Sequence, residues 1–366
     1  MNIFGVFYKT IFKPIAFQMD PEFVHDYILL FGKWLGKSAI GKKIIFKLFN
    51  FQSPKLEQKI LGINFKNPIG LSAGFDKNAE LLDILPSVGF GFAEVGSITG
   101  EACVGNSKKR LWRLPNSQSL VVNYGLKNDG AEVISKRLTG KQFIFPVGIN
   151  VAKTNNQDTV DRQTGIEDYA KAYRLFANIG DYSTINISCP NAFGGQPFTD
   201  PESLDQLLSK IDEIPSTKPV FVKFSPDMGI ETVDALLEVI SRHRVHGLVC
   251  TNLTKKRENQ NIHDKNIPEV GGLSGKVVEA LSNELIAYVY KKARGQYIII
   301  GCGGVFTAED AYRKVRLGAS LIELITGMVF QGPQIIGEIN RGLVKLLEQD
   351  GFTNISQAIG LDNPIT

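Results

Sequence analysis

Residues 297–326 read YIIIGCGGVFTAEDAYRKVRLGASLIELIT, with an apolar run at each end and a helical segment between them. The two runs are nearly continuous rather than alternating, which is typical of parallel strands buried on both faces. Thr307 suits a helix N-cap, and Glu309 and Asp310 suit the dipole of the first turn, so a helix is predicted over 307–317. This segment therefore predicts a strand–helix–strand unit of a parallel sheet.

The same alternation recurs along the chain from residue 66 onward. Eight strands, each followed by a helix, in about 280 residues predict a (β/α)8 TIM barrel. A doubly wound α/β sheet is the alternative, but it usually has a GxGxxG turn after its first strand, and that turn is absent. A hairpin is expected over 55–65, closing the barrel floor. The predicted strands are 68–73, 90–98, 145–151, 183–189, 219–225, 247–252, 297–302 and 320–326, and the other predicted helices include 165–180, 231–244 and 276–293.

The composition is that of a globular protein, because 43% of the 366 residues are hydrophobic and 21% are charged. The formal net charge of +4 comes entirely from residues 1–50, which hold seven Lys against three acids. The neutral remainder argues against a nucleic-acid partner. Four widely spaced Cys predict free thiols in a reducing compartment, and we expect no metal site.

Residues 1–50 also hold eleven aromatic side chains, and helices are predicted over 3–18 and 21–37. No apolar run reaches the roughly 18 residues of a spanning helix, and no signal peptide is expected. The first helix could pack on the barrel, or it could lie in a membrane interface with its rings among the lipid headgroups. The residues alone leave both interpretations open.

Active sites of such barrels lie at the carboxyl ends of the strands, where this sequence gathers three kinds of residue. Carboxamides offer a donor and an acceptor, which matches a flat ring with alternating N–H and C=O groups, such as a flavin or a pyrimidinedione. Lysines are costly to bury unless they meet negative charge, and glycines let backbone N–H groups approach a phosphate. One phosphate and one flat ring favour FMN over a dinucleotide. The carboxamides are Asn150, Asn186, Asn191 and Asn252, the lysines Lys77 and Lys223, and the glycines Gly303, Gly304 and Gly327.

Cys189 is the candidate reactive residue. Free Cys is among the residue types most often buried, so taken alone a packing role is the simpler interpretation. Its place between Asn186 and Asn191 favours a general base, because a thiol with an unperturbed pKa of about 8.5 can take a proton near neutral pH.

Together these residues resemble the dihydroorotate dehydrogenases, FMN-dependent enzymes of pyrimidine synthesis. The resemblance covers almost the whole chain and is closest to the quinone-dependent, membrane-associated class 2. Its motifs are weak singly and highly specific in combination. The matching stretches are 19–22, 73–78, 105–113, 147–150, 186–191, 222–223, 251–252, 271–275 and 303–304.

The resemblance implies oxidation of dihydroorotate to orotate, with Cys189 at the position of the base and a quinone as electron acceptor. It implies that residues 1–50 form a membrane-facing quinone entrance and residues 51–366 the catalytic barrel, on the cytoplasmic face of the inner or cell membrane. The implied cofactor-binding residues are Ala73, Gly74, Lys77, Ser97, Asn150, Asn186, Lys223, Thr251, Gly275, Gly304, Thr326 and Gly327. The implied substrate-binding residues are Lys77, Asn123, Asn186, Asn191 and Asn252.

The sequence also departs from the family pattern. Class 2 members usually have Ser where this chain has Cys189, as class 1 members do. In the substrate loop, a position that is Asn in the family is occupied by Val122 in this chain, and the nearest Asn is one residue later, at Asn123. Residues 193–196 replace a usual Leu-Arg, and Ile325 replaces a common Tyr. The flavin site thus matches better than the substrate site, which leaves open an FMN enzyme with another substrate or a membrane-docked flavin protein without catalysis.

Overall fold

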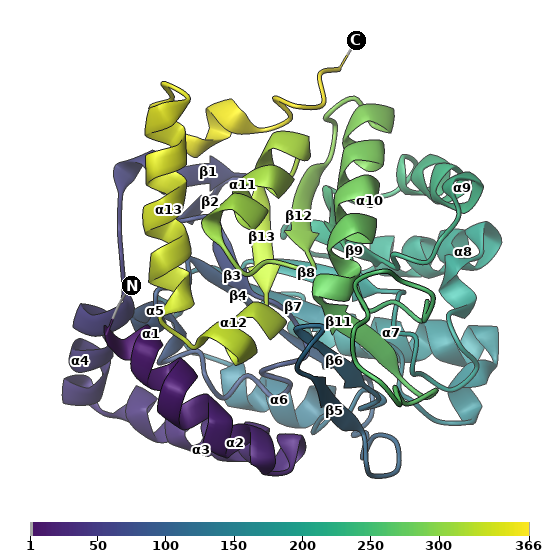
Figure 1. The fold of residues 1–366 in the computed structure, drawn as a ribbon. Helices are drawn as coiled ribbons and strands as arrows, with labels where there is room; N and C mark the ends of the chain where they lie inside the picture. Colours follow the sequence, from purple (N-terminus) through teal and green to yellow (C-terminus); the bar gives the residue numbers. More distant parts are fainter. Residues whose placement is uncertain (1–2, 366) are drawn as a thin grey trace.

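The computed structural model describes residues 3–365, and its centre is a closed barrel of eight parallel strands (Figure 1). Each apolar run predicted as a strand forms one of the barrel strands, so the (β/α)8 barrel is confirmed. In order around the barrel the strands are β3 (Ile69–Leu71), β4 (Phe92–Ile98), β7 (Val147–Val151), β8 (Tyr182–Asn186), β9 (Val220–Phe224), β10 (Gly247–Cys250), β12 (Ile298–Cys302) and β13 (Leu321–Leu324).

Helices cover the outside of the barrel, and at least one follows each strand. The helix predicted after Thr307 begins with a capping box, in which the Asp310 N–H donates to the Thr307 hydroxyl and the Thr307 N–H donates to the Asp310 carboxylate. The covering helices are α5 (Leu85–Val88), α6 (Ala131–Leu138), α7 (Arg162–Phe176), α8 (Pro201–Asp212), α9 (Ile230–Ile240), α10 (Glu279–Lys292), α11 (Ala308–Leu317), α12 (Thr326–Gln331) and α13 (Ile335–Gln349).

A hairpin closes the amino-terminal end of the barrel, as the sequence predicts. Strands β1 (Gln58–Ile60) and β2 (Ile63–Phe65) pair antiparallel around Gly62, whose φ of 82° favours glycine. The ring of Phe65 meets that of Phe92 edge to face, with 5.5 Å between centroids, inside an apolar cluster at the barrel floor. The floor of the barrel is therefore apolar, and the polar strand residues of the site lie at the opposite, carboxyl end.

A second small sheet flanks this carboxyl end. It is antiparallel and consists of β5 (Leu111–Leu114), β6 (Ser119–Val122) and β11 (Gly272–Gly275). Leu120 and Val122 of β6 belong to an apolar cluster that also includes residues of α2 and α12. The sequence does not predict this sheet, because its strands are short and β11 lies far from β5 and β6 along the chain.

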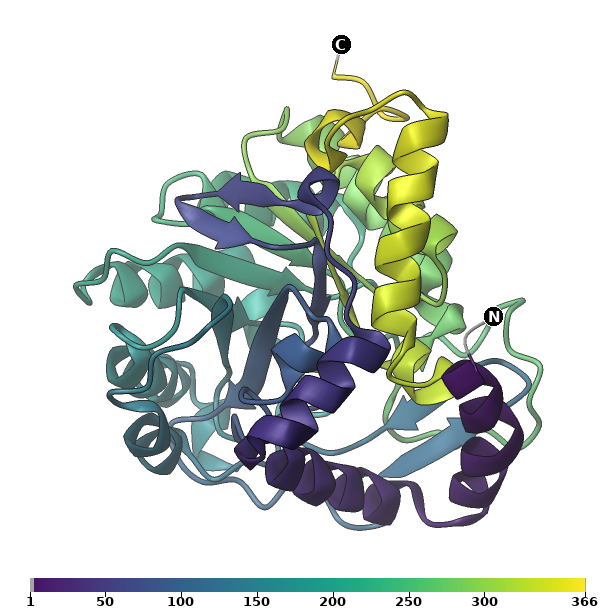
Figure 2. The ribbon, with the colours of Figure 1, turned by 90° about the vertical axis from the view of Figure 1, so that its left-hand side faces the viewer.

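The N-terminal residues form helices that lie together along one side of the molecule (Figure 2). The helix predicted over 3–18 is continuous, although a π-helical turn at Tyr8–Phe12 separates α1 (Ile3–Phe7) from α2 (Lys13–Gln18). The predicted second helix is α3 (Pro21–Lys37), and an unpredicted third is α4 (Ala39–Phe49).

A buried ion pair joins α3 to the small sheet. The guanidinium of Arg110 donates to both carboxylate oxygens of Glu22, with Nη2–Oε1 at 2.6 Å, and both side chains are almost fully buried. Burial opposes ionisation of Glu22, but the hydrogen bonds and charge of Arg110 outweigh it and hold the pKa of that carboxyl below its usual range. Arg113 adds a 2.7 Å bond to the Met19 carbonyl. The N-terminal helices are thus fixed to the barrel by polar as well as apolar contacts.

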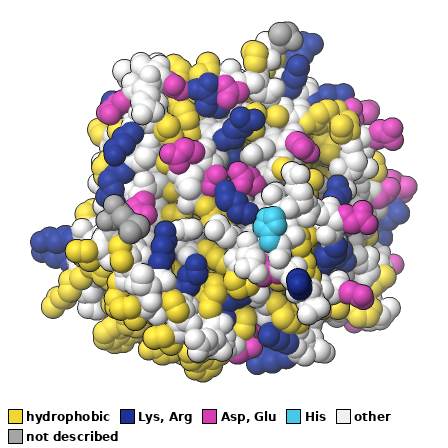
Figure 3. All heavy atoms as spheres, viewed as in Figure 1, with side chains coloured by type: hydrophobic (Ala, Val, Ile, Leu, Met, Phe, Trp, Pro, Cys, Tyr) yellow, Lys and Arg dark blue, Asp and Glu magenta, His cyan; other side chains and the backbone are white. Residues whose placement is uncertain are grey.

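The outer face of these helices is apolar. Of the 25 exposed large hydrophobic side chains in the described part of the chain, 14 lie between Ile3 and Leu48. They include Leu30 and Trp34 of α3, and hydrophobic side chains gather over this corner of the molecule (Figure 3). Within residues 3–365, no helix is both long and apolar enough to cross a bilayer.

Candidate active site

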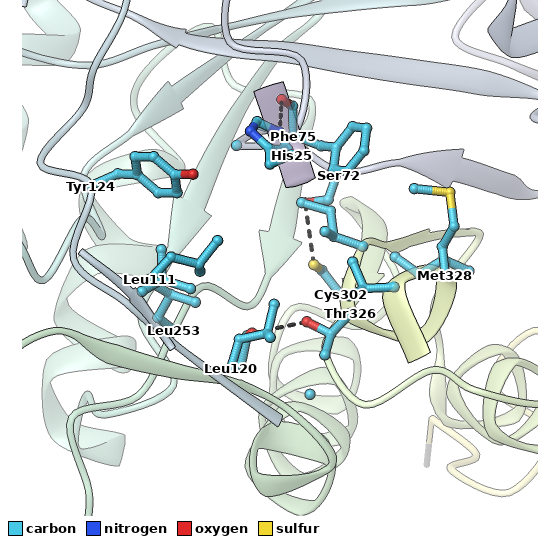
Figure 4. Close-up of a pocket in the computed structure, with 18 of the residues that line it drawn as sticks. His25, Ser72, Phe75, Leu111, Leu120, Tyr124, Leu253, Cys302, Thr326 and Met328 are labelled. Atoms are coloured by element: carbon cyan, nitrogen blue, oxygen red, sulfur yellow. Dashed lines mark hydrogen bonds between the residues drawn. The ribbon is translucent and has the colours of Figure 1, made fainter. Parts of the chain in front are cut away.

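A cavity of about 340 Å³ begins at the carboxyl ends of the barrel strands and continues beneath the N-terminal helices. Figure 4 shows some of the residues that line it. We call the part formed by strand ends the polar end. The part formed by Tyr8, Phe12, Phe17, Val24 and Ile28 is the apolar end. Most of the residues predicted for the site line this one cavity. They are Ala73, Gly74, Lys77, Ser97, Asn186, Cys189, Asn191, Lys223, Thr251, Asn252, Gly275, Gly304, Thr326 and Gly327.

Asn150 lies one layer behind the cavity wall. The Asn186 amide donates to the Ser97 hydroxyl at 2.8 Å, and that hydroxyl donates to the Asn150 carbonyl oxygen. The Asn150 amide in turn donates to Glu94 at 2.7 Å. Asn150 therefore acts on the cavity through Ser97 and Asn186, whose orientations it fixes.

Asn123 also lies outside the cavity lining. Its side-chain oxygen accepts a 3.0 Å hydrogen bond from the amide of Asn106, which also reaches the Asn191 carbonyl at 3.2 Å. The Asn191 amide donates to the Val122 carbonyl at 2.8 Å. Asn123 thus braces the loop that carries Asn191, while Val122 presents an apolar side chain to the cavity.

The two predicted lysines both line the polar end, where Lys223 is buried and Lys77 is half-buried. The Lys77 ammonium lies 4.0 Å from the centroid of the Tyr124 ring, and burial lowers the pKa of Lys77 to about 8. Lys223 lies between two buried carboxyl groups, 3.8 Å from Glu94 and 3.6 Å from Glu323. Burial disfavours its charge, but these carboxyl groups outweigh the effect and raise the pKa of Lys223. Both lysines can therefore supply positive charge to an anionic or electron-rich ligand.

One wall of the polar end is backbone. Gly275 and Gly304 have φ values of 93° and 74°, and a Cβ at either would overlap neighbouring atoms. Thr326 is the first residue of α12, and its hydroxyl pairs with that of Ser274 at 2.8 Å. Small residues that line the cavity with their backbone and a helix start together fit a phosphate group, so the residues present fit FMN.

Cys189 faces the cavity from a loop held on both sides. The Lys153 ammonium donates to the Phe193 carbonyl at 2.8 Å, and the Gln196 amide donates to the Ser188 carbonyl at 2.9 Å. Burial raises the pKa of the Cys189 thiol, and the backbone N–H of Asn191 and the charge of Lys153 only partly offset this. The residue lines the cavity, and the capacity of its thiol to accept a proton should grow as the pH rises.

Several residues in the cavity wall were missed from the sequence, as was Glu94, which lies behind that wall against Asn150. Glu94 and Glu323 left a signal, because a charged residue inside an apolar strand must face the barrel interior and find a partner there. His25 left none, and Arg113 lies in the family-matching stretch 105–113 without being assigned a role, since both come from elements outside the barrel. The His25 ring lies 3.0 Å from the Phe75 carbonyl, and burial lowers its pKa, so the imidazole is neutral near pH 7.

A family model described as dihydroorotate dehydrogenase matches residues 55–347. The chain belongs to the dihydroorotate dehydrogenase family. Similar proteins named "Dihydroorotate dehydrogenase (quinone)" occur in Haloarcula marismortui, with 40% identity over 96% of this chain and 98% of the relative. Another in Trichodesmium erythraeum is 35% identical over 97% of this chain and 99% of the relative. The quinone-dependent class 2 assignment is thereby confirmed.

Solved structures of the family agree with the fold. A ligand-free dihydroorotate dehydrogenase from Eimeria tenella superposes with a TM-score of 0.85 at 29% identity, covering 94% of this chain and 100% of that one. The complex of the Eimeria tenella protein with ferulenol gives a TM-score of 0.79 at 28% identity, covering 89% and 96%. Dihydroorotate dehydrogenases generally use a flavin, which agrees with the donor set at the polar end.

Proposed function

We propose that the protein oxidises dihydroorotate to orotate with bound FMN, using Cys189 as the general base, and passes the electrons to a quinone. The observation that carries the proposal is that one cavity contains both the polar end, with Cys189 and the neighbouring carboxamide side chains, and the apolar end. Substrate and acceptor can therefore approach one cofactor from different sides.

The FMN phosphate would meet the backbone wall formed by Gly275, Gly304, Thr326 and Gly327. The flavin ring would lie against the remaining strand ends, where Lys223 offers positive charge. When bound, the cofactor supplies a hydride acceptor and releases electrons to the quinone. The ring contacts are assigned to Ala73, Gly74, Lys77, Ser97, Asn186, Lys223 and Thr251, with Asn150 acting through Ser97.

Dihydroorotate would bind between Lys77 and the carboxamides Asn186, Asn191 and Asn252. Its carboxylate needs a cation, and Lys77 is a half-buried cation at the same wall. The carboxamides offer donors and acceptors to the ring imide and fix its position. In this arrangement Cys189 removes the proton from C5 while hydride leaves C6. The base and the hydride acceptor therefore act on the two carbons of the same C5–C6 bond.

The quinone would enter through the apolar end. Its ring would reach the inner boundary of that end, where the guanidinium of Arg113 and the neutral imidazole of His25 can meet its carbonyl oxygens. The apolar outer face of residues 3–49, together with the seven Lys of residues 1–50, suits a headgroup interface. We infer that residues 1–50 form a membrane-docking unit on the cytoplasmic side of the inner or cell membrane, and the end of α4 at Phe49 supports this boundary.

The direct test is anaerobic mixing of the purified holoprotein with dihydroorotate while the flavin spectrum is recorded. We expect loss of the oxidised flavin absorbance, followed by its recovery when a quinone analogue is added. Flavin that stays oxidised in excess dihydroorotate would contradict the proposed substrate.

A second candidate is an FMN enzyme of this family with a different substrate. It is favoured by one observation, the apolar side chain of Val122 in the substrate loop, where Asn123 is turned away to Asn106. A screen of dihydropyrimidines and other reductants for loss of flavin absorbance separates the two candidates.

A further inference from the structure

The polar end of the cavity contains a buried acid that the proposed reaction does not use. Glu323 lies on β13 with its side chain fully buried, and it contributes to the cavity wall. Neither carboxyl oxygen has a hydrogen bond of ordinary geometry within the described range, and the groups that favour its charged form are the Lys223 ammonium and the Ser72 hydroxyl. Its nearest cation, the Lys223 ammonium, lies 3.6 Å away. A buried carboxylate without hydrogen bonds of ordinary geometry is costly, so this group needs a physical explanation.

A second buried carboxyl group competes for the same lysine. Glu94 accepts hydrogen bonds from Asn150 at 2.7 Å and from the Thr184 hydroxyl at 2.6 Å, and it lies 3.8 Å from Lys223. Hydrogen bonds to the charged form favour ionisation, and a neighbouring carboxylate disfavours it. The proton shared by this pair therefore resides on Glu323, and burial together with the Glu94 carboxylate raises the pKa of Glu323.

The other groups around Glu323 add no charge. Cys302 is its register partner on β12, and the Cys302 thiol lies 3.4 Å from the Ser72 hydroxyl (Figure 4). Burial raises the pKa of the Cys302 thiol and of the Tyr182 hydroxyl, so both stay neutral. The titratable and charged groups that face Glu323 are Glu94, Tyr182, Lys223 and Cys302.

We propose that Glu323 is a positioning residue that controls, through its proton, how much of the Lys223 charge the flavin experiences. With Glu323 protonated, Glu94 and Lys223 balance each other. With Glu323 ionised, the cluster carries one net negative charge beside the cofactor. The proposal rests on the flavin position given under the proposed function.

The consequence is a coupling between flavin reduction and a proton. Electrons that arrive on the flavin increase the negative charge near Glu323 and so raise its affinity for a proton. At alkaline pH, reduction should be accompanied by formation of an O–H bond between the Glu323 carboxylate and a solvent proton. The electrons come from the added reductant, and no other bond changes.

The test compares the midpoint potential of the FMN holoprotein with that of Glu323→Gln, over the pH range in which both stay folded. At the acid end the two potentials should coincide, because Glu323 is neutral in both proteins. Toward the alkaline end the variant should have the more positive potential and the shallower dependence on pH. A merely structural effect would shift the potential equally at all pH values.

An infrared difference spectrum upon reduction gives an independent reading on the unmodified protein. At alkaline pH, the native holoprotein should gain a protonated carboxyl band that Glu323→Gln lacks. Ser72→Ala keeps the carboxyl group and should retain the pH effect. Glu348→Gln removes an exposed carboxylate outside the cavity, so its potentials should match the native ones.

Parallel potential curves for the native protein and Glu323→Gln would overturn the proposal. An infrared difference spectrum of the native holoprotein without a change in the carboxyl band would also overturn it. If Glu323→Gln does not retain flavin, this spectrum of the native protein alone tests the proposal. Since dyes and a chemical reductant set the potential, dihydroorotate is not needed. A holoprotein that shows the proton coupling but is not reduced by dihydroorotate would refute the proposed substrate and leave this inference intact.

Discussion

At the polar end of the cavity, side chains come from barrel strands and the loops that follow them, and hydrogen bonds tie many of them to one another. At the apolar end, they come from helices that rest on the barrel through rings and a few polar contacts, such as the 2.8 Å bond from the Tyr8 hydroxyl to the Val329 carbonyl. The polar end fixes a small charged molecule in one orientation. The apolar end offers mainly apolar contact area and few directional hydrogen bonds, which suits a lipid-soluble molecule that must enter and leave.

The largest expected effect lies at the polar end. Cys189→Ala should lower the rate of flavin reduction by dihydroorotate about 10²- to 10⁴-fold, because it removes the base. Reoxidation by quinone at the apolar end should not change, and anaerobic stopped-flow measurement of each half-reaction checks both statements. Cys103→Ala, a buried Cys outside the cavity lining, is the matched control. Equal reduction rates in Cys189→Ala and the native protein would remove Cys189 from its role.

The junction of the two ends depends on the pair between Glu22 and Arg110. Glu22→Ala leaves a buried guanidinium without its partner, so the free energy of unfolding should fall by about 3–5 kcal/mol. Glu57→Ala breaks the exposed pair with Lys66 and should cost roughly 0–1 kcal/mol. Denaturant titrations of both variants measure the difference. A loss as small as that of the control would mean that apolar packing alone holds the N-terminal helices.

Substrate affinity at the polar end should depend on pH through Lys77. Burial lowers the pKa of Lys77 to about 8, so the ammonium that would bind a carboxylate is lost as the pH rises through that value. Orotate binding should therefore weaken by up to about tenfold per pH unit above it. Calorimetric titration of orotate at a series of pH values measures this. Lys77→Arg keeps its charge and should show a flatter profile, and identical profiles would contradict the role of Lys77.

The smallest expected effect concerns the outer surface of the apolar end. Trp34 is 64% exposed on α3, and Trp34→Ser should weaken binding to anionic lipid vesicles about fivefold, which is roughly 1 kcal/mol. Ile144 is 82% exposed elsewhere on the surface, and Ile144→Ser should leave vesicle binding unchanged. Vesicle co-sedimentation measures both. Equal losses in the two variants would argue against a specific membrane-facing side.

The interpretation of the first helix, which the sequence left open, changes once the structure is known. One side of α1 and α2 packs on the barrel, where the Phe17 ring meets that of Phe330 at 5.3 Å between centroids. The other side leaves Ile11 and Ile15 half exposed or more. Both interpretations therefore describe part of the same helix. A helical spacing of apolar residues cannot show how wide the covered face will be.

The site was predictable only in part, because a local sequence pattern does not show which neighbours surround a side chain. Asn186 and Lys223 lie at the carboxyl ends of β8 and β9, and Lys77 lies in the loop after β3. Every strand of a parallel barrel ends at the same mouth, so their meeting follows from the alternation alone. Whether a side chain reaches the cavity depends on its neighbours. Asn150 is held behind Ser97, and Asn123 is turned to Asn106.

By itself, the sequence determined the barrel, its floor hairpin, the first two N-terminal helices and the family motifs, because periodic burial and strand-end chemistry are local in the chain. Only the tertiary structure decided that α3 closes on the mouth through Glu22 and Arg110. It also decided that Glu94 and Glu323 share one lysine. These arrangements join residues far apart along the chain, and their energies come from charge and burial, which no local pattern encodes.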